Sequence, residues 1–190
     1  RAIAPRPGVL LMDEPFSGLD VELRAAMQEE TQALLQETRA TSIIVTHHPE
    51  EAMRFADRIA VMRSGRIVQL GRARELYNRP ADIFVNRLFS AANEIPAVVE
   101  KGGVDTAFGR FAAIGFAEGA KVIVAIRQHG VAVSTNGSGP NARLIDVAFL
   151  GDEAIASYSV EGLDAPIRAR MRDRSEAGGA GDIKIMVKRD

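Results

Sequence analysis

The sequence contains no cysteine, so neither a disulfide framework nor a thiolate metal site can form. No apolar run approaches the roughly 18 residues that span a bilayer, and the opening residues "RAIAPRPG" lack the apolar core of a signal peptide. Charge of one sign is not in excess, because 24 Lys and Arg residues stand against 25 Asp and Glu residues. The net charge of -1 excludes a general attraction to nucleic acid or to an anionic bilayer. We therefore expect a soluble chain, suited to a reducing cytosol, that reaches a membrane only through another protein.

The first part of the chain has the pattern of an α/β fold. The runs "VLLM" at 9–12 and "SIIVT" at 42–46 are typical of parallel strands buried on both faces, although a buried helix has the same apolar pattern. Between them, residues 21–38 place Leu23, Met27 and Leu34 on one helical face. The sequence therefore predicts a strand, a helix and a parallel strand, joined as a right-handed crossover.

Shorter elements follow, and the pattern then changes to an all-β one. A short helix is predicted from Pro49, a hairpin of strands 58–62 and 66–70 turns at Ser64 and Gly65, and helices are predicted at 72–78 and 81–90. Past Asn93, short strands separated by turn residues predict a small barrel or sandwich, with loops at 134–141 and 175–182. The predicted strands are 96–100, 104–108, 121–127, 130–134, 142–150, 153–160, 165–171 and 182–188. We place the domain boundary near 90–95, between domains at 1–92 and 93–190.

Two adjacent acids end the first apolar run, in "VLLMDEPFSGLD" at 9–20. Ligands of open α/β sheets bind beyond the carboxyl ends of the strands, where Asp13 and Glu14 stand. A strand that ends in Asp can hold Mg²⁺ beside a nucleotide, and a second carboxylate can then polarise an attacking water. Strand alternation would point the two acids in different directions. The alternative is that both residues simply begin a solvated loop.

The longer string decides between these alternatives. "LLMDEPFSGLD", followed after one helix by "SIIVTHHPEEAMRFADRIAVMRSGRIVQLG", resembles the second half of the nucleotide-binding subunit of ATP-binding cassette (ABC) transporters over residues 1 to about 90. The resemblance implies ATP and Mg²⁺ as cofactors. In this reading Asp13 ends the Walker B strand and contacts Mg²⁺ largely through water, Glu14 is the general base, and His47 contacts the γ-phosphate. Ser17, Gly18, Leu19 and Asp20 would form the D-loop that touches a second copy of the subunit.

Structural roles remain open for several of these residues. Asp20 would cap the helix that starts at Val21 in either reading. On spacing alone a hydrogen-bonded core histidine is the better interpretation of His47, and only the flanking match reverses this in favour of the phosphate contact. Metal binding by His47 and His48 is disfavoured, because adjacent histidines at a strand end should point apart and no third ligand is evident. The resembled family usually has Asp at position 48, where His is a poorer helix cap; His48 could change how His47 is oriented and make that orientation sensitive to acidity.

Two motifs of the resembled family do not occur in the 190 residues, namely the phosphate loop G-x-x-x-x-G-K-[ST] and the LSGGQ signature. "RAIAPRP" resembles the helix that follows the signature, so we interpret the chain as an N-terminally truncated fragment. The phosphate loop supplies the backbone N–H groups and the Lys that cradle the nucleotide phosphates. We therefore predict that this chain alone does not turn over ATP.

Residues from about 93 onward resemble the OB-like barrel, or transport-associated regulatory domain, of importer ATPases. "SAANEIPAVV", "GVDTAFGRF" and "VIVAIRQHGVAV" carry the likeness, while "IRQHG" keeps only Arg127 of the usual Arg-Pro-Glu. The barrel would bind a regulatory anion or oligosaccharide, or pack against its twin, which we favour. The fold class is thus α/β, the C-terminal part of a P-loop ABC ATPase domain, plus an all-β OB-like barrel.

The resemblance implies an importer ATPase on the cytoplasmic face of the membrane. Its partners would be a second copy of the subunit, transmembrane permease subunits and, indirectly, a periplasmic or extracellular solute-binding protein. The phrase "VDTAFG" and the hairpin at 58–70 look most like the ferric iron branch, ahead of sulfate, molybdate, polyamine and sugar importers. The alternative is a non-catalytic module that dimerises or senses a ligand through its barrel. An ABC ATPase of DNA repair or translation is disfavoured by the tail and by the absence of a basic face.

Overall fold

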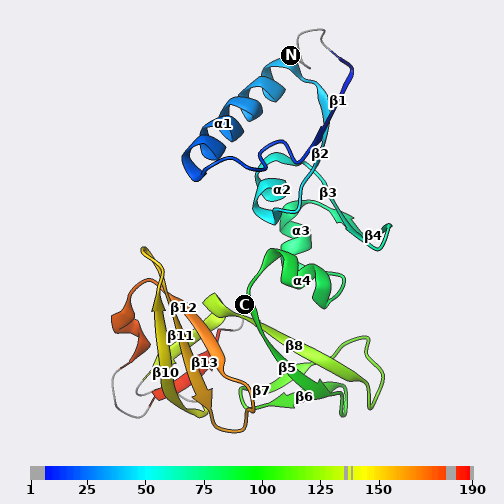
Figure 1. The fold of residues 1–190 in the computed structure, drawn as a ribbon. Helices are drawn as coiled ribbons and strands as arrows, with labels where there is room; N and C mark the ends of the chain where they lie inside the picture. The colour runs from blue at the N-terminus through cyan, green and yellow to red at the C-terminus, as the bar shows by residue number, and fades with distance from the viewer. Residues whose placement is uncertain (1–6, 135–136, 138, 179–182, 189–190) are drawn as a thin grey trace. The chain divides into compact units, whose positions relative to one another are not determined.

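The protein is described by a computed structural model that covers residues 7–134, 137, 139–178 and 183–188 (Figure 1). The chain forms two compact units, Arg1–Phe89 and Ser90–Asp190. The first unit mixes strands and helices, and the second is mostly β-structure. The resemblance of "RAIAPRP" to a helix falls on residues outside the described ones.

The first unit opens with the predicted strand, helix and strand. These are β1 (Val9–Asp13), α1 (Val21–Thr38) and β2 (Thr41–Val45). The strands pair in parallel, with Val9 opposite Thr41 and Asp13 opposite Val45. Helix α1 begins at the predicted N-cap, where Leu23 N–H donates to Asp20 Oδ1 over 2.9 Å. The strand and helix assignments and the cap are therefore confirmed.

The prediction that these two strands are buried on both faces is wrong for this chain. Leu11 is 71% exposed, and Ile43 and Val45 are each 55% exposed. Leu23 and Met27, predicted to share one face of α1, are also exposed, and the buried residue of that helix is the polar Gln28. The exposed side chains lie on one face and Leu10 on the other face is buried, so within the described residues only one face of this two-stranded sheet is covered.

The rest of the first unit packs around its own small core. The hairpin turns at Ser64 and Gly65, whose positive φ angles of 50° and 74° are those that a two-residue I′ turn requires. Its apolar side chains pack with those of the two helices that follow. The elements are α2 (Pro49–Phe55), β3 (Ile59–Arg63), β4 (Arg66–Gly71), α3 (Ala73–Asn78) and α4 (Ile83–Phe89). The fully or nearly buried residues are Ile59, Val61, Leu76 and Val85.

The second unit contains one five-stranded sheet and two ribbons of two strands (Figure 1). The sheet has the strand order β12-β11-β10-β13-β9, and the ribbons pair β5 with β8 and β6 with β7. The strands are β5 (Ala92–Val98), β6 (Gly103–Thr106), β7 (Gly109–Ala112), β8 (Lys121–Arg127), β9 (Val131–Ser134), β10 (Asn141–Phe149), β11 (Ala154–Val160), β12 (Ile167–Met171) and β13 (Ile183–Val187). Two single-turn 3₁₀ helices, η1 (Gln128–Gly130) and η2 (Arg174–Ala177), lie between strands.

Three sequence predictions for this unit need correction. The strand predicted at 96–100 starts at Ala92, because residues 92–98 pair with β8 along their whole length. The strand predicted at 104–108 is instead a hairpin, in which β6 turns back at Ala107 and Phe108 and β7 starts at Gly109. The flexible loop predicted at 175–182 contains η2, whose Ala177 is buried, while 179–182 lie outside the described residues.

The core of the second unit is centred on Tyr158, which is fully buried on β11. Its hydroxyl donates to Ala177 O over 2.9 Å, so the one polar atom of the ring has a partner. Burial raises the pKa of Tyr158 to about 12, since the phenolate would lose its hydration.

The side chain of Asn93 connects β5 to the edge strand β12. Its Nδ2 donates to Arg168 O over 2.9 Å and to Ile126 O over 3.3 Å, while Oδ1 accepts from Arg168 N–H over 2.8 Å. The amide therefore occupies both hydrogen-bonding groups of Arg168 in the way that a neighbouring strand would. Asn93 is only 7% exposed, so these bonds are largely shielded from water.

Candidate functional site

The predicted acids lie at the carboxyl ends of the two parallel strands of the first unit. Asp13 is the last residue of β1 and stands opposite Val45, the last residue of β2. Glu14 continues the contact, because its N–H donates to Val45 O over 2.8 Å. Its φ of 46° lies in the left-handed region, which a residue other than glycine adopts at a cost of about 1–3 kcal/mol. Strand alternation therefore stops at Asp13, and the left-handed turn sets the direction of Glu14.

The structure brings Glu14 and His47 together, 33 residues apart in sequence. His47 Nδ1 lies 2.5 Å from Glu14 Oε1. An ionised carboxylate only accepts hydrogen bonds, so Nδ1–H of His47 is the donor and Nε2 faces away from Glu14. The His47 side chain is 64% exposed and that of Glu14 34% exposed, so both are open to a ligand. This pair combines a carboxylate that can accept a proton with an imidazole that has one nitrogen left for another partner.

Asp13 differs from Glu14 in its contacts. Its side chain is exposed, and within the described part of the chain its carboxylate has no hydrogen bond or ion pair. Magnesium usually binds through one or two carboxylates and takes its remaining ligands from water and substrate phosphates. A single free carboxylate beside a second acid fits that chemistry. Among the described residues no group of three or more His, Cys, Asp and Glu side chains forms a complete metal site.

The segment that follows the acids is fixed by one aromatic anchor. Phe16 is 3% exposed and stacks on Phe55 of α2, with ring centroids 5.3 Å apart. On either side of it, Ser17 N–H donates to Glu14 O over 3.1 Å, and Arg24 donates to Leu19 O over 2.9 Å. The predicted partner-contact residues Ser17, Gly18 and Asp20 are exposed, and Leu19 is partly buried. They therefore form an ordered, accessible loop, and their contact with a second copy stays a prediction.

Sequence reasoning missed a buried polar network behind His47. Glu51 on α2 is 6% exposed and accepts from Thr46 Oγ1 over 2.6 Å. Gln28 on α1, 8% exposed, donates to the other oxygen of Glu51 over 3.4 Å and accepts from Arg54 over 3.3 Å. Glu51 and its partner Gln28 are 23 residues apart in sequence, so no local signal could have found the network.

His48 corrects one premise of the sequence reasoning. Adjacent histidines were expected to point apart, but the ring centroids of His47 and His48 lie 4.0 Å apart. His48 is the N-cap residue of α2, and its side chain makes no capping hydrogen bond. Pro49 follows at the first helical position, as predicted.

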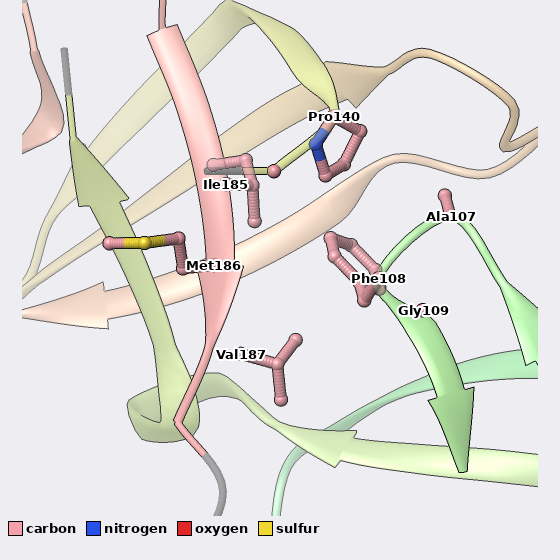
Figure 2. Close-up of a pocket in the computed structure, with 8 residues that line it drawn as sticks. Ala107, Phe108, Gly109, Pro140, Ile185, Met186 and Val187 are labelled. Carbon is pink, nitrogen blue, oxygen red and sulfur yellow. The ribbon is translucent and has the colours of Figure 1, made fainter. Parts of the chain in front are cut away.

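The second unit contains a separate pocket (Figure 2). Its volume is about 400 Å³, and its lining comes from the turn between β6 and β7, from 139–140 and from β13. Figure 2 shows the rings of Phe108 and Pro140 and the side chain of Val187 around the same space. No lining residue among the described ones carries a charge. The pocket therefore offers a ligand no charged side chain among the described residues.

Comparisons with known proteins were made on the whole chain. No family model matches it. It is 34% identical over 174 residues, 92% of its length, to the Fe(3+) ions import ATP-binding protein FbpC 3 of Rhodococcus jostii, and the match covers 50% of that relative. It is 43% identical over 136 residues, 67% of its length, to the spermidine/putrescine import ATP-binding protein PotA 1 of Pseudomonas aeruginosa, covering 37% of that relative. The chain thus spans about half or less of the curated relatives it matches.

Among solved structures, the cytoplasmic molybdate-binding protein ModG with molybdate bound aligns with a TM-score of 0.41 and 14% identity. The alignment covers 52% of this chain and 92% of ModG. In the part of the chain that the structure describes, no helix is both long and apolar enough to cross a membrane.

Proposed function

Because the chain is homologous to the ATP-binding subunits of ABC importers, we propose that it is part of the ATP-hydrolysing subunit of such an importer. The observation that carries this proposal is the contact between Glu14 and His47 beside Asp13, at the carboxyl ends of two parallel strands. Bound ligands are expected at that edge of an open α/β sheet. The relatives support ATP hydrolysis as the class of reaction. The geometry supports Asp13, Glu14 and His47 as the side chains that take part.

Each group has a separate role in this proposal. Asp13 would hold Mg²⁺ largely through water, and the ion would neutralise charge on the nucleotide phosphates. Glu14 would accept the proton of the attacking water, a contribution of about 10²- to 10⁴-fold in rate. His47, held through Nδ1, would present Nε2 to the γ-phosphate. To donate a hydrogen bond there while Nδ1–H contacts Glu14, the ring must carry both protons.

The proposal extends to partners and location. The exposed loop Ser17–Asp20 would contact a second copy of the subunit, and permease subunits would hold the dimer at the cytoplasmic face of the membrane. A periplasmic or extracellular solute-binding protein would act through the permease. Ferric iron is the favoured cargo, because the iron relative matches along 92% of the chain and the polyamine relative along 67%. Uptake of labelled iron and of spermidine by cells with and without the intact protein would distinguish the two cargoes.

The catalytic roles are tested by measuring Mg-dependent ATP hydrolysis of the intact protein. We expect Glu14→Gln to lower kcat by about 10²- to 10⁴-fold. Glu37→Gln, at the exposed end of α1, is the matched control and should leave kcat unchanged. The 190-residue chain alone should show no turnover, since it carries no phosphate loop. Hydrolysis by this chain that Glu14→Gln abolishes would refute the prediction of no turnover, and full activity of the Glu14→Gln intact protein would refute the catalytic role of Glu14.

A second candidate function rests on the pocket of the second unit. Its volume of about 400 Å³ has room for a small ligand, in a chain whose working role is sensing or dimerisation. Titration of the chain with ATP, with molybdate or sulfate, and with small uncharged ligands separates the candidates. Binding of one of these small ligands without ATP binding by the intact protein would favour this second function.

A further inference from the structure

The two imidazoles of His47 and His48 lie against each other beside the Glu14 contact. Their ring centroids are 4.0 Å apart, and the planes are inclined by 39°. Consecutive side chains of an extended segment point to opposite sides, and the backbone of His48 is extended, with φ of -98° and ψ of 103°. The contact is therefore not forced by chain connectivity, and both rings have to turn toward one another to make it.

The His48 side chain is free for this contact because it makes no capping hydrogen bond to the first turn of α2. Pro49 removes one of the N–H groups that a cap would satisfy. The backbone N–H of His48 donates to Thr46 Oγ1 over 3.0 Å. Thr46 is itself fixed by its bond to the buried carboxylate of Glu51. The hydrogen bonds of Thr46 thus fix the backbone around His48, and the His48 ring contacts His47.

His47 needs such support, because little else restricts its ring. Its side chain is 64% exposed, and its one described hydrogen bond is that from Nδ1–H to Glu14 Oε1. An exposed side chain with a single bond samples several rotamers, and ordering it has an entropic cost. A second ring in contact with the His47 ring reduces the number of orientations that the His47 ring samples. The bond to Glu14 then forms at a smaller entropic cost.

We propose that His48 is a positioning residue that holds the His47 ring with Nδ1–H on Glu14 and Nε2 facing the reacting phosphate. The purpose assigned to this orientation rests on the proposed function. The orientation itself does not, because it is a property of three side chains in this chain. Asp at position 48, the usual residue of the resembled family, would cap α2 but would supply no ring.

The test is the tautomer of His47, read from the ¹⁵N chemical shifts of the imidazole nitrogens in the 190-residue chain. The sequence has only three histidines, and His129 in the second unit serves as an internal reference. We expect His48→Ala to lower the ratio of the Nδ1–H to the Nε2–H tautomer of His47 by about two- to tenfold, the worth of one aromatic pair. His48→Phe keeps a ring without its nitrogens and should preserve the ratio. His48→Asp should lower it as His48→Ala does, although it improves the cap of α2.

Glu14→Ala removes the acceptor of this contact and should change the His47 shifts while leaving those of His129 in place. An unchanged tautomer ratio in His48→Ala, together with a changed one in Glu14→Ala, overturns the positioning role. A lowered tautomer ratio in His48→Phe also overturns it, since the ring alone would then be insufficient. Unchanged His47 shifts in Glu14→Ala would show that the contact to be positioned is absent. No nucleotide enters this measurement, so failure of the ATPase assay and failure of the ring contact are separate results.

Discussion

Replacing Asn93 tests whether its side chain stabilises the edge strand β12 by supplying the hydrogen bonds that a neighbouring strand would otherwise make. Asn93→Ala removes three hydrogen bonds and leaves the N–H and C=O of Arg168 without their partner. Each unsatisfied buried group costs about 1–3 kcal/mol, so we expect the free energy of unfolding of the second unit to fall by about 2–4 kcal/mol. With a urea m-value of about 1.5 kcal/mol/M, the midpoint of that unit should move down by about 1–3 M.

The assay follows the second unit through its own fluorophore. The chain has no Trp and two Tyr residues, so Tyr77→Phe leaves Tyr158, in the core of the second unit, as the only tyrosine. Unfolding in urea is then recorded by tyrosine fluorescence in this background. Asn93→Asp should destabilise at least as much as Asn93→Ala, because it places an acceptor opposite two carbonyl oxygens.

Asn141→Ala is the matched control. Asn141 also lies on a strand and bonds Glu161 and Lys184 through its side chain, but it is exposed. Its loss should therefore lower the free energy of unfolding by less than about 1 kcal/mol. Equal midpoint shifts for the Asn93 and Asn141 variants would refute the reasoning, since burial of the bonds would then have no effect.

Two further predictions concern the aromatic residues of each unit. Phe16→Ala should lower the free energy of unfolding of the first unit by about 3 kcal/mol in a urea titration followed by circular dichroism, because it empties the space against Phe55; Phe16→Leu should lose less than half of that. Tyr158 has a pKa raised from 10.0 to about 12, so the unfolded chain releases this proton first and stability should fall as the pH rises from about 10 to about 12. Tyr158→Phe should remove that part of the pH dependence, and an unchanged slope would contradict the assignment.

Local chemistry was predictable from the sequence where a few neighbouring residues decide it. The cap at Asp20 and the turn at Ser64 and Gly65 depend on side chains and φ angles within four residues. The turn at Ala107 and Phe108 was missed because neither residue is a usual turn former, so the predicted strand ran through the turn and β7 was not predicted.

Burial and long-range contacts were not predictable in the same way. An apolar run predicts a strand, but whether Leu11 or Ile43 is covered depends on how many layers surround the sheet. The bond of Asn93 to Arg168 spans 75 residues, and that of Glu14 to His47 spans 33. For Asp13, Glu14 and His47 the family resemblance supplied the roles, which stay predictions, while the structure supplied the contact between two of them.

At Glu14, backbone strain and the need for a carboxylate favour different residues, because its φ of 46° suits glycine while its contact with His47 requires the side chain. Glycine would adopt a φ of 46° without steric penalty, so Glu14→Gly relieves backbone strain and at the same moment removes the only carboxylate that His47 contacts among the described residues. Selection for stability alone would favour the smaller residue. A glutamate in this conformation therefore combines backbone strain with the carboxylate contact to His47, and glycine could not combine the two.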